Sequence, residues 1–287
     1  MPVSKKTVLI TGCSDGGIGA AMVKVFHEKG YHVFATLRNT SKAGTLTKLN
    51  DVEILELEVA SEESIAKCVE QVRSRTGGTL DILVNNAGRD FVMPLLDADI
   101  DEAKKLFDVN FWSMLVITQA FSPMLIKAKG VIVNHGSIVW NLFIPWGGIY
   151  SASKAAIKQL SDTMRVELQP LGVRVVTVVI GAVDTPVFIN SNPEPFKMPS
   201  SSYYQPIRQL IEDQRDGKVQ PKMEHVDVTA RHIVNDVLGG ASGCIWYGEK
   251  STDAKWLSWL LPAWALEMIT NGTKGLSELR QYYATGS

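Results

Sequence analysis

Cysteine is scarce in this chain: the 287 residues include only Cys13, Cys68 and Cys244, and no two of them form a CxxC pair. Such spacing excludes a disulfide framework and a cysteine zinc site, and it favours a reducing compartment. The five histidines form no HExxH motif and no pair at metal-ligand spacing. We therefore predict no metal site.

The chain also lacks an excess of charge of either sign. Its formal net charge is -1, so no electrostatic field would gather nucleic acid, and we expect no nucleic-acid partner. No apolar leader precedes the first expected strand, and no run reaches the ~20 apolar residues that span a bilayer. The longest apolar segment, Trp256 to Ile269, is interrupted by Pro262. We expect a cytoplasmic protein, with peripheral contact to the cytosolic face of a membrane or a lipid droplet left open.

The patterning is that of a globular α/β protein, with 45% hydrophobic and 21% charged residues. Short apolar, β-branched runs alternate with longer helical patterns, and this alternation predicts one doubly wound parallel sheet with a Rossmann-like fold. The expected strands are Val8–Ile10, Val33–Leu37, Glu53–Leu57, Ile82–Val84, Val131–Asn134, Val173–Ile180 and Cys244–Tyr247. The expected helices are Ile18–Lys29, Glu62–Arg75, Glu102–Lys127, Ser151–Leu171 and Ile207–Arg215.

The composition changes after residue 184, where proline and serine become frequent. We predict one dinucleotide-binding and catalytic domain over residues 1–250, in which residues 184–222 form a substrate loop or lid. Residues 251–287 are expected to form a C-terminal helical extension of the same domain.

A glycine-rich turn follows the first expected strand and opens the first helix, with the sequence Thr11-Gly12-Cys13-Ser14-Asp15-Gly16-Gly17-Ile18-Gly19. Glycines allow a tight turn and a close approach of pyrophosphate to the helix N-terminus. By itself this pattern is weak evidence, and its position between strand and helix strengthens it.

The nucleotide preference is indicated at the end of the second expected strand. An acidic residue there would bind the ribose hydroxyls of NAD, whereas an arginine would pair with the 2′-phosphate of NADP. The chain has no carboxylate at this point and has Arg38 instead, with Ser14 as a second candidate contact. The sequence therefore favours NADPH/NADP, although a solvated surface arginine would look the same.

Tyr150 and Lys154 are four residues apart at the start of an expected helix, so they share one helix face. A free tyrosine has a pKa of ~10, and a neighbouring ammonium would lower that pKa and make Tyr150 a usable acid and base. A YxxxK pair alone occurs often by chance. The context strengthens it, because Ser137 follows the expected strand Val131–Asn134, at the edge where ligands bind in open α/β sheets.

Two further polar features support this site. Asn110 lies inside an expected helix, where asparagine is mildly unfavourable and so suggests a specific partner. Asn85-Asn86-Ala87-Gly88 ends the fourth expected strand with small residues, which would let the backbone meet a ligand. Taken singly, Ser137 and Asn110 could equally be satisfied polar residues at element ends.

With these motifs in place, residues 5–190 resemble the short-chain dehydrogenase/reductase family. The resemblance rests on the glycine turn, the NNAG segment, Asn110, Ser137, the YxxxK pair and Ile180–Thr185. It implies hydride transfer between NAD(P) and a carbonyl or alcohol. In that case Tyr150 would act as acid and base, Lys154 would orient the nicotinamide ribose, Ser137 would bind the substrate oxygen, and Asn110 would hold a water in a proton relay.

The resemblance and the turn together define a set of expected cofactor contacts beyond Tyr150 and Lys154. These are Gly12, Ser14, Gly17, Ile18, Gly19, Arg38, Glu58, Val59, Asn86, Ala87, Gly88, Gly181, Val183 and Thr185. Three departures from the family pattern are visible: the turn is one residue longer, Glu58 replaces an aspartate near the adenine, and Ile180 replaces a proline. They put the adenine contact and the last loop in doubt.

More narrowly, Ile126–Gly130 and Gly148–Ile157 resemble fungal NADPH-dependent 1-acyldihydroxyacetone-phosphate reductases. Aromatic and aliphatic residues lie between Ser137 and Tyr150. With Phe188, Tyr203 and Tyr204, they suggest a pocket for a small-molecule carbonyl substrate that is bulky and largely apolar. The alternative is that these side chains pack between subunits. The intervening residues are Trp140, Leu142, Phe143, Ile144, Pro145 and Trp146. Arg89 is a weaker candidate for an anionic head group.

We therefore predict an NADPH-dependent ketone reductase that forms a homodimer or homotetramer. Alternatives are an alcohol or steroid-type dehydrogenase, a biosynthetic reductase of an imine or enone, and a non-catalytic NADP-binding regulator. The tryptophan-rich C-terminal segment could contact a membrane surface, cover the substrate or join subunits.

Overall fold

A seven-stranded parallel sheet forms the centre of the computed structural model, which describes residues 4–219, 222–271 and 274–285. The strand order is β3-β2-β1-β4-β5-β6-β9. From β1 the chain first adds strands on one side of the sheet and then, from β4 onward, on the other side, which is the order of a doubly wound sheet. The strands are β1 (Thr7–Thr11), β2 (His32–Leu37), β3 (Val52–Glu56), β4 (Ile82–Asn85), β5 (Val131–Ser137), β6 (Arg174–Ile180) and β9 (Gly243–Tyr247). The predicted fold class is confirmed.

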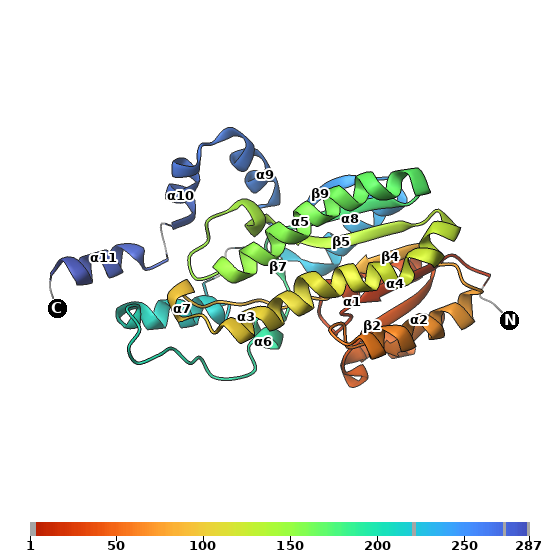
Figure 1. Ribbon diagram of the computed structural model, residues 1–287, viewed down its shortest axis with the longest axis horizontal. Helices are drawn as coiled ribbons and strands as arrows, with labels where there is room; N and C mark the ends of the chain where they lie inside the picture. Colours follow the sequence, from red (N-terminus) through yellow and green to blue (C-terminus); the bar gives the residue numbers. More distant parts are fainter. Residues whose placement is uncertain (1–3, 220–221, 272–273, 286–287) are drawn as a thin grey trace.

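Helices cover both faces of this sheet (Figure 1). On one face, α1 (Ile18–Glu28) and α8 (Val226–Leu238) pack on the strands, and α8 was not expected from the sequence. On the other face lie α2 (Glu62–Thr76), α4 (Ser113–Ala128) and α5 (Gly148–Leu168). Strand residues alternate between the two cores, as Val8 and Ile10 join the first and Leu9 joins the second.

The expected helix Glu102–Lys127 is divided in the structure. It comprises α3 (Ile100–Phe107), a π-helical turn η3 (Asp108–Trp112) and α4. The whole stretch Ile100–Ala128 is long and apolar enough to cross a membrane by length and composition, which the sequence patterning had not suggested. However, Phe121 and Leu125 are fully buried against the sheet, so its apolar residues serve the core.

The predicted substrate segment contains α6 (Val187–Ser191), η6 (Gln205–Ile207) and α7 (Arg208–Arg215), with an irregular path between α6 and η6. A two-stranded sheet joins β7 (Val183–Asp184) to β8 (Glu224–His225). The remaining short helical turns are η1 (Thr40–Lys48), η2 (Leu95–Asp97), η4 (Ile138–Asn141) and η5 (Gln169–Leu171). Residues 220–221 of this segment lie outside the described residues.

The C-terminal extension forms α9 (Ser251–Leu260), α10 (Ala263–Asn271) and α11 (Leu276–Ala284). These helices lie at one end of the molecule, away from the amino-terminal strand and helix layers (Figure 1). Residues 272–273 and 286–287 of the predicted extension are outside the described part of the chain.

Candidate active site

The glycine turn joins β1 to α1 in a cradle that requires glycine at specific positions. Gly12 has a φ of +72°, and a Cβ on it would lie 2.8 Å from Ala87 Cα. A Cβ on Gly19 would lie 2.6 Å from both Asn86 Nδ2 and Gly12 O. The glycine turn and the NNAG segment therefore meet backbone to backbone, a contact that the sequence analysis had not predicted.

Asn86 fastens these two segments together. Its Nδ2 donates hydrogen bonds to Thr11 O at 2.8 Å and Gly12 O at 3.1 Å. The buried Thr11 hydroxyl in turn accepts from the backbone N–H groups of Asn86 and Ala87. Sequence reasoning missed Thr11, whose signal was a polar residue at the end of an apolar strand.

The N-terminus of α1 is open toward this cradle. Its N-cap residue is Gly17, and no side chain caps the first amides of the helix. Uncapped amides and the helix dipole together favour a bound anion. Ile18 and Gly19 are buried, whereas Ser14 and Gly17 are partly exposed.

Arg38 follows β2 and has an 81% exposed side chain. Its guanidinium lies 3.7 Å from the Glu58 carboxylate, a surface pair that holds it only weakly. Glu58 is itself 38% exposed, while its neighbour Val59 is buried. Arg38 is thus accessible to a nucleotide phosphate. Glu58, which was predicted to contact the adenine, instead has its carboxylate beside Arg38.

Strand β5 runs to Ser137, three residues further than predicted, so Ser137 ends the strand instead of following it. The side chains of Ser137 and Tyr150 form a hydrogen bond. Ser137 also accepts from Val139 N at 3.4 Å and caps η4. Two of the predicted catalytic residues are therefore in direct contact.

Lys154 lies one turn along α5, with its Nζ 5.7 Å from the Tyr150 ring centroid. Lys154 is buried, and its Nζ donates a 3.0 Å hydrogen bond to the backbone oxygen of His135. Burial lowers the pKa of Lys154 to about 8, and the charge of Asp90 acts against this shift. A buried cation is thus held beside the tyrosine by strand β5.

The expected lowering of the Tyr150 pKa is wrong for this structure. Burial raises the pKa of the phenol, the charge of Asp90 raises it further, and the hydrogen bond from Ser137 lowers it by less. Desolvation is the largest of these effects, and the hydrogen bond of Lys154 goes to His135 O rather than to the phenol. Tyr150 is therefore held in the protonated form that a proton donor requires.

Asn110 lies in the π-helical turn η3 and is 2% exposed. Its Nδ2 donates to Arg89 O at 3.0 Å and to Ser153 Oγ at 3.2 Å, and its Oδ1 accepts from Arg89 N at 2.9 Å. Ser153 Oγ donates to Tyr150 O at 2.7 Å. Asn110 thus links the loop after β4 to the start of α5, and the added residue of the π turn aims its side chain there.

The last predicted contacts surround the end of β6. A Cβ on Gly181 would lie 2.1 Å from Glu249 O, so only glycine fits against the β9–α9 connection. Val183 is buried in β7, and Thr185 is partly exposed just beyond it. Gly88 lies close to the catalytic group, since a Cβ on it would be 3.8 Å from Lys154 Nζ.

Two titratable residues near this site were not predicted. His135 lies in β5 and its Nδ1 is 3.0 Å from Asn86 Oδ1, while burial lowers its pKa to about 3, so the ring is neutral. Asp90 lies two residues beyond the NNAG segment, and burial raises its pKa to about 6. A polar residue within an apolar strand, and a carboxylate beside the motif, were the available signals.

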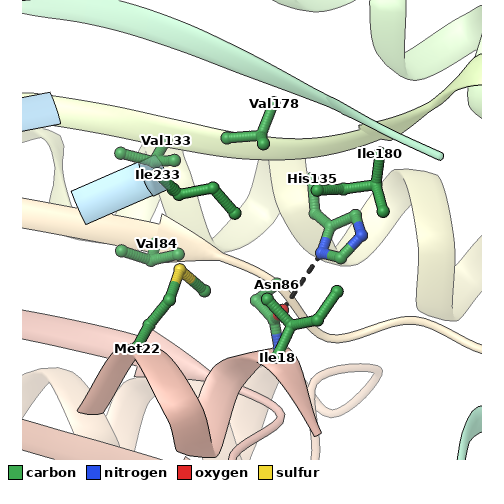
Figure 2. Close-up of a pocket in the computed structure, with 9 residues that line it drawn as sticks. All are labelled: Ile18, Met22, Val84, Asn86, Val133, His135, Val178, Ile180 and Ile233. Carbon is green, nitrogen blue, oxygen red and sulfur yellow. Dashed lines mark hydrogen bonds between the residues drawn. The ribbon is translucent and has the colours of Figure 1, made fainter. Parts of the chain in front are cut away.

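Figure 2 shows a small cavity between α1 and the sheet, with the His135 ring and Asn86 at one end and apolar side chains around the rest. Its volume is about 10 Å³, the room that one water molecule needs. It is too small for a substrate.

A larger hollow of about 400 Å³ lies beside the start of α5 and the C-terminal extension, a size typical of small-molecule sites. Its lining residues are Leu142, Phe143, Ile144, Pro145, Gly148, Ser151, Glu267 and Leu276. Trp146, predicted to line the pocket, is instead buried in a cluster with Val92 and Phe196, and its Nε1 donates to Lys274 O at 2.9 Å. Its positive φ of 68° turns the chain at this point.

Comparison with known proteins shows to which family the chain is related. Residues 6–195 match the model of the family described as short chain dehydrogenase. A short-chain dehydrogenase, cctT, from Talaromyces islandicus is 52% identical over 255 residues, which cover 89% of each chain. An NADPH-dependent 1-acyldihydroxyacetone phosphate reductase from Schizosaccharomyces pombe is 41% identical over 74% of this chain and 72% of its own.

Among solved structures, a short-chain dehydrogenase from Streptomyces avermitilis is similar over the full length of both chains, with a TM-score of 0.75 and 26% identity. The family match covers the glycine cradle, Asn110, Ser137, Tyr150 and Lys154 together. This chain belongs to the short chain dehydrogenase family.

Proposed function

We propose that this oxidoreductase uses NADPH to reduce a ketone on a bulky, largely apolar substrate to an alcohol. The observation that carries the proposal is the contact of Ser137 with Tyr150 beside the buried Lys154. These groups lie at the carboxyl edge of the sheet, where ligands bind in doubly wound folds.

The cradle fits a dinucleotide. Glycine is required at Gly12 and Gly19, the α1 amides are uncapped, and Arg38 is exposed at the end of β2 with no carboxylate on that strand end. Phosphates would lie against the turn at Gly12, Ser14 and Gly17, and the 2′-phosphate would meet Arg38. NADPH, when bound, supplies the hydride.

The protein's residues supply the proton and hold the carbonyl. Ser137 is placed to donate a hydrogen bond to the carbonyl oxygen, and Tyr150 donates the proton that this oxygen gains. The raised pKa of Tyr150 keeps the phenol protonated before reaction, as a proton donor must be. Lys154 keeps a positive charge beside the phenolate that forms, and Asn110 holds the loop of Arg89 and the start of α5 in register.

The hollow beside α5 supports an apolar substrate, since Leu142, Phe143 and Ile144 line it. The relative named for a 1-acyldihydroxyacetone phosphate suggests a ketone with a long acyl chain as one member of this class. Reduction of an imine or enone would use the same groups, and so the substrate panel must include both.

The test is NADPH consumption by the purified chain across apolar ketones, an enone and an imine, with Tyr150→Phe alongside. We expect ketone turnover that the variant lowers by about 10²–10⁴-fold, the usual contribution of a positioned acid. Tyr31→Phe, at a tyrosine that follows α1 and packs against Phe26, is the control and should keep full activity. Tight NADPH binding without turnover of any probe would contradict reduction and favour a regulator.

We also propose that α9 and α10 contact a lipid surface. Trp259, Trp264 and Met268 are 76%, 65% and 72% exposed, and these three residues are called here the apolar surface of the extension. Tryptophan favours the membrane interface, where an apolar helix face can lie among the headgroups. This surface would place the chain at the cytosolic face of a membrane or lipid droplet.

A homodimer or homotetramer also stays a proposal. Exposed apolar residues on the long helices support it, because Trp112 next to α4 is 51% exposed and Val166 on α5 is 60% exposed. Sedimentation equilibrium would decide it, and a monomer at micromolar concentration would contradict it.

A further inference from the structure

Trp146 lies four residues before Tyr150, in the turn that leads into helix α5. Its φ of 68° is in the left-handed region, which a bulky side chain rarely adopts. The next residue, Gly147, is the N-cap of α5 and makes no side-chain hydrogen bond to the first amides of the helix. Tyr150 lies in that first turn, where backbone N–H groups lack helical partners. The position of Tyr150 therefore depends on contacts that reach this turn from elsewhere in the chain.

Two backbone oxygens of the turn accept hydrogen bonds from distant segments. Met93 N, in the loop after β4, donates to Trp146 O at 2.7 Å. Gln214 of α7 is buried, and its Nε2 donates to Pro145 O at 3.0 Å. These bonds hold the unfavourable conformation of Trp146, because strain of this kind persists only where the surroundings determine it.

The Trp146 side chain connects this turn to the C-terminal extension. Its Nε1 donates to Lys274 O at 2.9 Å, and its ring meets Tyr204 edge-on with the centroids 5.2 Å apart. Trp146 belongs to a buried apolar cluster against which Leu276 of α11 packs. The other buried members of the cluster are Val92, Phe196, Ile207 and Ile211. The extension thus contacts the turn before Tyr150 through one buried side chain.

We propose that Trp146 is a positioning residue for Tyr150, and that the C-terminal extension supports turnover through it. Trp146 and Leu276 hold the turn, and the turn sets where the Tyr150 hydroxyl lies relative to the substrate carbonyl. A displacement of about 1 Å in a reacting group can lower the rate about 10²-fold even when the change is far from the chemistry. This inference rests on the proposed role of Tyr150 as proton donor, and the effect is separate from lipid contact.

Two variants weaken this connection from its two ends. Trp146→Phe keeps an aromatic ring beside Tyr204 and removes the hydrogen bond to Lys274 O. Leu276→Ala removes packing on the side of α11 and leaves the sequence of the turn unchanged. We expect each variant to lower kcat by about 10–100-fold, while the Kd of NADPH stays that of the wild type. Saturating ketone is used because Leu276 also lines the hollow, where its loss can weaken substrate binding.

The two changes should not act independently. Both act on the same turn, so the double variant should lose about as much kcat as the more damaged single variant. Leu260→Ala is the matched control, since this leucine lies in the same extension on α9 and is 63% exposed. It should keep the kcat of the wild type.

The position of Tyr150 can also be followed without turnover. Replacement of the seven tyrosines by 3-fluorotyrosine gives each a ¹⁹F signal, and Tyr150→Phe identifies the signal of Tyr150. With NADP bound, Trp146→Phe and Leu276→Ala should both shift this signal. Leu260→Ala should leave it in place.

An unchanged Tyr150 signal in both variants would overturn the proposal, even if their urea midpoints fall, because Trp146 would then be structural only. A rise in KM at constant kcat would also overturn it, since the extension would then act on substrate binding alone. If no ketone turns over but the Tyr150 signal moves in both variants, the positioning role stands and the proposed reduction fails.

Discussion

Lys154 Nζ donates a hydrogen bond to the backbone oxygen of His135, 3.0 Å away, and so ties helix α5 to strand β5. The neighbouring strand residue Ser137 contacts Tyr150. A strand therefore sets the spacing between the buried cation and the proton donor, although Tyr150 and Lys154 lie on the same helix.

This arrangement predicts a loss of ketone reduction as the pH rises through about 8, the pKa that burial gives Lys154. Above this pH the ammonium is lost, and the phenolate that forms on Tyr150 is no longer stabilised. The measurement is kcat/KM between pH 6 and 10. The residual activity of Lys154→Arg, which stays charged, should show no such fall.

The same shift has the opposite effect on stability. The folded pKa of Lys154 is below the ordinary value of 10.5, so between pH 8 and 10.5 the unfolded chain binds more protons and this group adds stability as pH rises. Urea midpoints should therefore show no Lys154-dependent loss above pH 8. A parallel fall of midpoint and activity that Lys154→Met abolishes would contradict this assignment.

Arg38→Ala should weaken NADPH binding by about 10–100-fold, because the 2′-phosphate loses a charge-assisted hydrogen-bond partner. NADH binding should change little, since NADH carries no phosphate there. Kd values for both nucleotides, from quenching of intrinsic fluorescence, provide the check. Arg75→Ala, which removes an exposed arginine paired with Glu53, is the matched control. Equal weakening of NADH binding and NADPH binding would show that Arg38 does not bind the 2′-phosphate.

Gly12 and Gly30 form a matched pair for testing the cradle. Both have positive φ, +72° and +81°, but a Cβ on Gly30 meets nothing within 4 Å. Alanine at either position should cost roughly 1–2 kcal/mol of unfolding free energy from the strained backbone. Gly12→Ala should cost about 1–3 kcal/mol more, because its Cβ clashes with Ala87. Only Gly12→Ala should also lose NADPH affinity; equal urea midpoints and affinities would contradict the close approach seen here.

The exposed tryptophans of the extension predict binding to uncharged vesicles. Asp253, Lys255 and Glu267 are the charged residues of α9 and α10, so attraction to anionic lipid should be small and binding should persist in high salt. Co-flotation with phosphatidylcholine vesicles should fall when Trp259 and Trp264 are both changed to serine. Trp112→Ser, at an exposed tryptophan beside α4, should not change flotation. If the double variant floats like the wild type but dissociates into monomers, the surface joins copies of the chain.

The alternation of apolar strands and amphipathic helices was enough to predict the doubly wound sheet, since a strand buried on both faces must be apolar along its length. Helix α8 was not predicted because charged and polar residues separate its buried residues, such as Ile233 and Val237, along the sequence. These apolar residues come together on one side only when the helix packs on the sheet. Motif spacing likewise led to the prediction of Tyr150, Lys154, Ser137 and the glycine turn as site residues, because residues close in sequence have a nearly fixed local geometry.

Tertiary structure alone decided the rest. Desolvation depends on the whole surroundings of a side chain, so only the folded chain shows that the pKa of Tyr150 is raised and that of Lys154 lowered. The contact of Asp90 N with Ser191 Oγ and the burial of Trp146 in a cluster with Phe196 likewise join segments distant in sequence. Sequence determines which groups are available, and long-range packing determines which of them meet and in what charge state.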